Sequence, residues 1–213
     1  MFRDKKNIII GFIIIILLLG NSYLFYQLNE IVNNEDRDSH IYAGQMITMV
    51  QWLENNMESF IESSRDLEEN YEEEDIHTWN GIMHNSFQAH VLSREILDIE
   101  FRSIRRPSLI SSSYLKGIED ELEDIDYILA VIRQSIYSIN RELMSSNEKN
   151  SNLSLESLGK LETIHELYAL IGDIVDVEDK MTIDREEMYK LVEPLERIDL
   201  LNKWEFRSIE TGD

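Results

Sequence analysis

LKGIEDELEDIDYILAVIRQSIYSINREL, residues 115–143, carries the clearest pattern in this chain of 213 residues. Large aliphatic residues recur along it in strictly alternating steps of three and four. They are Leu115, Ile118, Leu122, Ile125, Leu129, Ile132, Ile136, Ile139 and Leu143. This spacing is typical of an α-helix that buries one stripe in a coiled-coil-like seam. Because the entropy of ordering the chain offsets most of what that burial contributes, the helix needs other helices to pack against.

Two helices are expected on the N-terminal side of this stretch. The first covers about 28–71 and ends at the acidic run 68–75. Its seam reads Met46, Val50, Leu53, Met57, Phe60, Ser64, Leu67 and Tyr71. The second reaches about Arg105, is stopped by Pro107 and contains a turn at Asn80-Gly81.

A fourth helix is expected beyond the polar linker 144–154. Its apolar positions are Leu158, Leu161, Ile164, Tyr168, Ile171 and Val175. The segment 177–184 breaks it, and a last amphipathic segment at 188–201, interrupted by Pro194, is expected to extend it. Short connections favour antiparallel neighbours, so the sequence predicts an all-α antiparallel four-helix bundle whose chain returns towards the membrane, with Trp204 and Phe206 near it.

A long apolar segment precedes the bundle. Residues 8–28 are 21 residues without a charge, which matches the ~20 residues that cross a bilayer as a helix. Arg3, Lys5 and Lys6 precede it, whereas mostly acidic residues follow. By the positive-inside rule this predicts a single-pass anchor in the cell membrane, with its N-terminal end in the cytoplasm and the bundle outside.

A cleaved signal peptide is the alternative interpretation of the same segment. The basic start, the short apolar core and the small pair Gly20 and Ser22 all fit one. The mature protein would then begin with the apolar residues 23–26 and would be a secreted helical protein.

These patterns divide the chain into five parts. Residues 1–7 form a cytoplasmic basic start, 8–28 a transmembrane signal anchor, 29–40 a juxtamembrane stalk, 41–204 the extracytoplasmic bundle and 205–213 a frayed tail.

Charge and composition exclude several classes of function. The chain has 42 acidic and 20 basic residues, a formal net charge of −22. Such a surface repels nucleic acid, which binds through Lys and Arg. The chain has no cysteine, which excludes disulfides, thiol catalysis and cysteine-bound zinc.

The residues that could hold a metal do not match the known sequence patterns of metal sites. Two Glu-x-x-His units, Glu74–His77 and Glu162–His165, have the spacing used in di-iron bundles, but the first is expected at the end of the bundle and the second near the middle of a helix. The acidic groups at 68–75 and 173–179 lack the alternating ligands and central glycine of a calcium loop. The sequence therefore predicts no metal site.

No catalytic or cofactor-binding residue is assigned either. Methionines and tryptophans at helical spacing are more often core than binding groove. They are Met46, Met49, Trp52, Met57, Trp79 and Met83. Serines have no His and Asp at a recognisable spacing, so we expect no enzyme.

The sequence favours a membrane-anchored interaction module, an accessory or scaffold subunit of a membrane or envelope complex. Its partners would be the bilayer, through residues 8–28, and another membrane or envelope protein, with homo-oligomers as a further option. A ligand-sensing bundle is the alternative, and in layout it is similar to the extracytoplasmic four-helix domains of bacterial chemoreceptors. Because only six or seven residues are expected in the cytoplasm, signalling would need a partner.

Overall fold

The computed structural model describes residues 2–65, 73–104, 114–145, 153–178 and 180–198. Five α-helices dominate it, and 88% of the described residues are helical. The prediction of an all-helical protein with a long apolar N-terminal helix is therefore confirmed.

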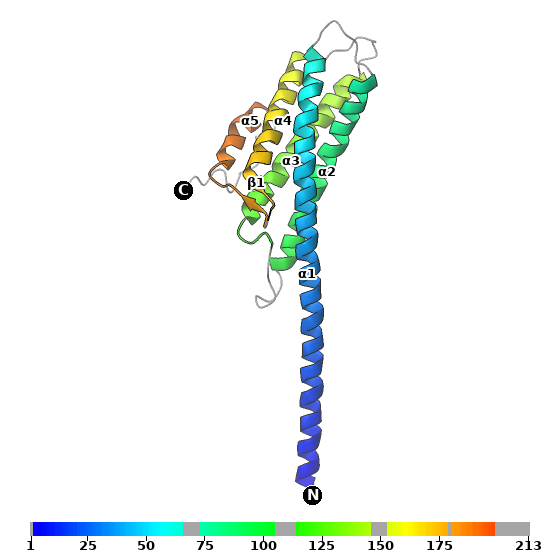
Figure 1. The fold of residues 1–213 in the computed structure, drawn as a ribbon, viewed down its shortest axis with the longest axis vertical. Coiled ribbons are helices and arrows are strands. Elements are labelled where there is room, and N and C mark those ends of the chain that lie inside the picture. The colour runs from blue at the N-terminus through cyan, green and yellow to red at the C-terminus, as the bar shows by residue number, and fades with distance from the viewer. Residues whose placement is uncertain (1, 66–72, 105–113, 146–152, 179, 199–213) are drawn as a thin grey trace.

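Helix α1, Phe2–Arg65, is 64 residues long and runs without a break from the apolar segment into the folded domain. Its N-terminal half projects alone from the molecule (Figure 1). This part is long and apolar enough to cross a membrane, and none of the most apolar stretch is buried. A core helix would be buried, so this apolar stretch is not part of the core that the structure describes.

Packing on α1 begins close to the end of the apolar segment. Val32 and Ser39 are already buried, although 29–40 is polar in sequence and was expected to be a stalk. The distance from Leu28 to Val32 is about one helical turn, or ~6 Å at 1.5 Å per residue.

Three further helices pack beside the C-terminal half of α1. They are α2 (Glu73–Ile104), α3 (Glu119–Ser145) and α4 (Leu155–Ile174). Helix α1 contacts α2 and α4, and α3 contacts the same two helices from the other side (Figure 1). The chain reverses direction between successive helices.

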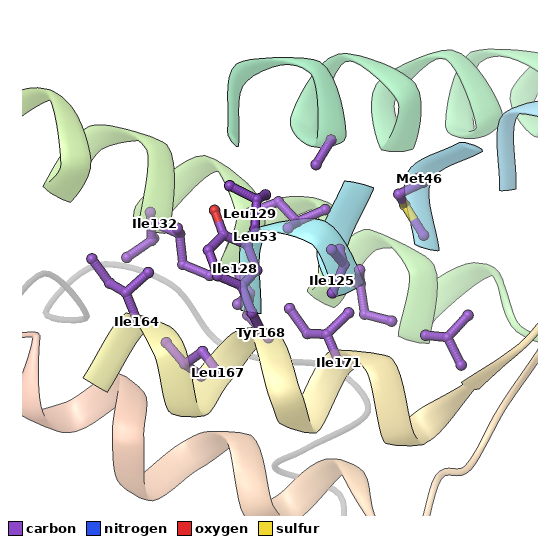
Figure 2. Close-up of a cluster of buried hydrophobic side chains, with 14 of the residues drawn as sticks. Met46, Leu53, Ile125, Ile128, Leu129, Ile132, Ile164, Leu167, Tyr168 and Ile171 are labelled. Carbon is purple, nitrogen blue, oxygen red and sulfur yellow. The ribbon is translucent and has the colours of Figure 1, made fainter. Parts of the chain in front are cut away.

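The core lies where these four helices meet. Figure 2 shows Tyr168 of α4 close to Leu53 of α1 and to Ile128 and Leu129 of α3. In the stretch 115–143, all the aliphatic seam positions are buried except Leu143, which is partly buried.

Helix α3 begins later than the seam does. Leu115 and Ile118 lie in a turn, in which the Ile118 amide donates to the Leu115 carbonyl at 3.2 Å. Gly117 occupies this turn with φ of +92°, a conformation that favours glycine because it has no Cβ.

The turn expected at Asn80-Gly81 is wrong, because α2 passes through both residues as a regular helix. A Cβ on Gly81 would lie 2.7 Å from Cη2 of Trp52. Glycine here permits close approach of the Trp52 ring from α1 to α2.

The last segment does not extend α4, so this prediction is also wrong. Strands β1 (Val175–Asp176) and β2 (Thr182–Ile183) form an antiparallel hairpin, with Val175 opposite Ile183. The hairpin reverses the chain, and the 3-10 helix η1 (Met188–Leu191) and α5 (Val192–Arg197) fold back against α4. β-branched residues favour this extended pairing. Trp204 and Phe206 lie outside the described residues.

Pro194 is tolerated within α5. It is the third residue of that helix, in the first turn, where backbone amides have no partner inside the helix.

Candidate functional site: the α2–α3 groove

The most distinctive surface of the described structure is the seam between α2 and α3. We call it the α2–α3 groove and define it as residues 76–94 of α2 and 126–144 of α3. The two helices contact each other along this seam. The hairpin, η1 and α5 do not cover it, because they lie against α4 on the other side of the molecule from α2 (Figure 1).

At one end of the groove, the buried carboxylate of Asp126 joins α2 to α3 through hydrogen bonds. Asp126 is only 5% exposed. Its Oδ1 accepts a hydrogen bond of 2.6 Å from the Ser93 hydroxyl, and its Oδ2 accepts one of 3.2 Å from Nη1 of Arg94. A buried charge is tolerated only when it is hydrogen-bonded and paired, so these contacts fix the register between α2 and α3.

His90 lies beside Asp126. Its Nε2 is 3.7 Å from Oδ1 of Asp126, while its buried Nδ1 has no hydrogen-bond partner among the described residues. Burial lowers the pKa of His90 and outweighs the opposing effect of Asp126, and the nearby Arg133 and Arg94 lower it further. The imidazole is therefore held in its neutral form.

An open hollow of about 430 Å³ lies in the middle of the groove. It is lined by Met83, Ser86, Phe87, Arg133, Gln134, Ile136 and Tyr137. The guanidinium of Arg133 sits 5.7 Å from the centre of the Phe87 ring, within the range of a cation–π interaction. Both aromatic rings remain open to solvent, with Phe87 46% and Tyr137 65% exposed.

A smaller hollow of about 230 Å³ continues the groove at its other end. Trp79 forms its wall, stacked on Phe60 with ring centres 5.0 Å apart. The indole N–H donates to Oδ1 of Asn140 at 3.0 Å. Ile76 and Met144, also lining residues, are 54% and 73% exposed. The groove thus presents apolar side chains to solvent along its length.

The groove has fewer acidic residues than the rest of the molecule. Residues 76–93 contain no Asp, Glu, Lys or Arg, and residues 127–141 contain two arginines and no acidic residue. The chain as a whole has 42 acidic residues. Apolar exposure therefore coincides with a scarcity of exposed acidic residues, since Asp126 is buried and Glu142 accepts a hydrogen bond from Ser157, while Asp75 borders the smaller hollow.

The groove is suited to binding rather than to nucleophilic catalysis. The Ser93 side chain is fully buried, and its hydroxyl donates to the carboxylate of Asp126 instead of to the imidazole of His90. A serine nucleophile needs an adjacent base and access to substrate. The exposed aromatic rings, Met144 and Arg133 instead belong to the residue types enriched at protein interfaces.

The Glu-x-x-His units considered from sequence occupy different helices. Glu74 and His77 lie at the start of α2, whereas Glu162 and His165 lie on α4. Glu162 accepts a hydrogen bond of 2.6 Å from Arg65. Across the described part of the chain, no three His, Asp or Glu side chains form a group that could hold a metal ion.

The two acidic groups are only partly described. Glu68, Glu69 and Glu72 lie outside the described residues. In the second group, Oδ1 of Asp176 accepts a hydrogen bond of 3.0 Å from the Glu178 amide, which organises the hairpin turn.

Most of the methionines and tryptophans lie in or against the core, as expected: Trp79 is buried and Met49 and Met83 pack against the core, whereas Trp52 is 36% exposed. Met46 and Met57 are fully buried in the core. Trp79 and Met83 line the two hollows of the groove. The groove was not predicted from the sequence, although the run of uncharged residues at 76–93 is a signal that could have indicated it.

A second polar contact ties α1 to the turn before α3. Nδ1 of His40 and the Tyr114 hydroxyl share a hydrogen bond of 2.8 Å, with the rings edge to face. Burial raises the pKa of Tyr114, so the phenol stays protonated. This contact braces the end of the domain that lies nearest the apolar half of α1.

Comparison with known proteins found no matching family model, no similar curated protein and no similar solved structure.

Proposed function

We propose that this protein is a membrane-anchored interaction module whose helical domain stands outside the cytoplasm as an accessory or scaffold subunit of a membrane or envelope complex. The observation that carries the proposal is the continuity of α1. One helix provides an apolar, unburied half suited to a bilayer and a second half that forms part of the core.

The orientation in this proposal rests on charge. Three basic residues precede the apolar segment, whereas acidic residues dominate after it. Lys and Arg are retained on the cytoplasmic side of a membrane, which places the domain on the opposite side. Cleavage near Gly20 and Ser22 would instead release it as a secreted protein.

The absence of cysteine makes the topology directly testable. Asn33→Cys introduces one thiol just after the apolar segment, at an exposed position, and Asn7→Cys introduces one before it. A membrane-impermeant maleimide added to intact cells should label the first variant and should label the second only after permeabilisation. The reverse pattern would contradict the orientation, and a shortened chain recovered outside the membrane fraction would support secretion.

The interaction role is tested by cross-linking in intact membranes. The exposed apolar groups of the α2–α3 groove support such a role. A photo-reactive amino acid placed at the exposed position of Tyr137 in the groove should yield a discrete product of higher mass. A chain that stays uncross-linked in native membranes under several growth conditions would argue against an interaction module.

Ligand sensing is the second candidate, and the hollow at Arg133 favours it. Its volume of about 430 Å³ falls in the range of small-molecule sites, ~300–1,000 Å³. A small anionic aromatic molecule that raises the melting temperature of the detergent-solubilised chain would support sensing if Arg133→Gln removed the effect. An equal effect in both proteins would assign the binding elsewhere.

A further inference from the structure

We propose that the α2–α3 groove is a self-association surface and that its occupant is the same groove of a second copy in the same membrane. This inference names a partner for the proposed interaction module and therefore rests on that function. Four properties of the described residues carry it: charge, exposed apolar groups, size and direction.

Charge restricts which faces of two copies can meet. Each chain has a net charge of −22, so most pairs of faces bring carboxylates together, and like charges in contact oppose association. The groove is poorer in acidic residues, since 76–93 carries no charged residue and 127–141 carries only Arg133 and Arg141. Of the carboxylates beside these stretches, Asp126 is buried, Glu142 binds Ser157 and Asp75 borders the smaller hollow. Two copies that meet here keep most of their acidic side chains in solvent.

Exposed apolar groups give the contact its driving force. Ile76, Phe87, Tyr137 and Met144 are all open to solvent at the edges of the two hollows. Each is a large side chain beside a depression, so a second copy can bury such a group in the hollow of the first. Aromatic anchors in pockets of this kind dominate the free energy of association at interfaces.

The size of the groove fits a modest interface. Residues 76–94 span ~27 Å along α2, and two helices are ~20 Å wide together. The contact would thus bury on the order of 1,000 Å² in total, near the lower bound for specific interfaces. Anchoring both copies in one bilayer offsets the small area, because it raises their effective concentration.

The direction of the helices allows this contact to form while both copies remain anchored in the same membrane. Helices α2 and α3 run alongside α1 (Figure 1), so a two-fold axis parallel to α1 brings groove to groove while both apolar halves point the same way. The axis places α2 of each copy opposite α3 of the other. Arg133 then faces Phe87 of the second copy, an arginine–aromatic pairing like the one within each chain.

Cross-linking of single-cysteine variants in native membranes tests the placement. Gln134→Cys puts a thiol in the groove, and Gln45→Cys puts one on an exposed position of α1. A short bifunctional maleimide should give a dimer of this chain from the Gln134→Cys variant, with at least ~10-fold lower yield from the Gln45→Cys variant. Equal yields, or a product that contains a different protein, would overturn the inference.

Measurement of mass in detergent tests the energetics. Tyr137→Asp places a carboxylate in the groove at a position exposed enough to leave the fold intact, and Tyr189→Asp on η1 is the matched control. The dimer dissociation constant should rise roughly 30-fold for Tyr137→Asp and stay unchanged for Tyr189→Asp. Circular dichroism should show equal helix content in both variants.

Raising the salt concentration should tighten the dimer, because it screens the repulsion between two acidic domains. A wild-type chain that is monomeric both in membranes and in detergent would overturn the inference. It would leave the proposed anchoring intact, since labelling by the impermeant maleimide tests that separately.

Discussion

At the scale of single residues, the Tyr168 hydroxyl is the least expected group in the core. The side chain is fully buried, and its oxygen has no hydrogen-bond partner among the described residues. Burial raises the pKa of Tyr168 well above its ordinary value, so the group stays a neutral phenol. Leaving such a group unpaired costs stability, while the ring itself fills the centre of the core.

Tyr168→Phe should therefore preserve or increase stability. Removal of the unpaired hydroxyl should raise the free energy of unfolding by about 1 kcal/mol, measured by chemical denaturation of the detergent-solubilised chain. Tyr168→Ala is the matched comparison and should lower it by ~3–5 kcal/mol, because it leaves a cavity. A loss of more than ~1 kcal/mol in the Phe variant would show that the hydroxyl has a partner, such as a buried water.

His90 should make the stability of the domain depend on pH. Because burial lowers its pKa in the folded state, the unfolded state binds more protons in the window below the ordinary value of ~6.5. The stabilising contribution is thus complete above that value and is lost as the pH falls through the folded-state pKa. The melting temperature should drop between pH 7.5 and pH 5.5, above the range where most carboxylates titrate.

Two histidine variants on α2 separate this effect from general acid sensitivity. His90→Gln should flatten the pH dependence. His84→Gln, at an exposed position of the same helix, should retain the wild-type slope. Identical slopes in all three proteins would exclude His90 as the responsible group.

At the scale of elements, α2 passes close to α1 at Gly81. Gly→Ala within a helix normally adds about 1 kcal/mol of stability. At Gly81 the new Cβ would lie 2.7 Å from the Trp52 ring, which must swing away and lose its packing. We expect Gly81→Ala to gain nothing or to lose ~1 kcal/mol, with a red shift of tryptophan fluorescence as Trp52 becomes more exposed.

Gly159 on α4 is the matched control for that substitution. A Cβ there meets nothing within 4 Å, so Gly159→Ala should show the normal increase of ~0.5–1 kcal/mol. Equal gains at both positions would mean that the Trp52 ring moves aside at no cost.

The helical elements could be predicted from periodicity, whereas their irregularities could not. The apolar run before Leu28 and the spacing of 115–143 depend on local sequence alone. The hairpin at Val175 and Ile183 depends on pairing between two-residue strands, which leaves no periodic signal. A turn was predicted at Gly81 because its local sequence does not show the reason for the glycine. That reason is the ring of Trp52, which approaches Gly81 from another helix.

The candidate groove was not predicted from the sequence, because its residues come from two separate stretches of the chain. Its two sides, 76–94 and 126–144, are separated by more than 30 residues, and neither contains a recognised motif. The buried Ser93–Asp126 contact that fixes their register joins residues on different helices. Only the fold brings these residues to one face.

At the scale of the whole molecule, net charge should govern how stability responds to salt. Several described ion pairs are exposed on both sides, such as Arg65–Glu162 and Arg197–Glu166, and exposed pairs contribute little. Repulsion among excess carboxylates should dominate. The melting temperature in a non-ionic detergent should rise with added NaCl, and a fall would mean that attractive pairs outweigh the repulsion.

Calcium chloride at matched ionic strength is the control for specific binding. Screening alone should give equal shifts with either salt. A clearly larger shift with calcium would show that some carboxylates bind the ion directly.

The unbroken course of α1 has a mechanical consequence. From Leu28 to Arg65 the helix extends ~55 Å beyond the apolar segment at 1.5 Å per residue. Membrane helices tilt by ~20° on average, and by more in thinner bilayers. With no hinge between the two halves of α1, such a tilt would sweep the far tip of the domain sideways by roughly 19 Å. The height and lateral position of this tip above the lipid surface would therefore depend on bilayer thickness.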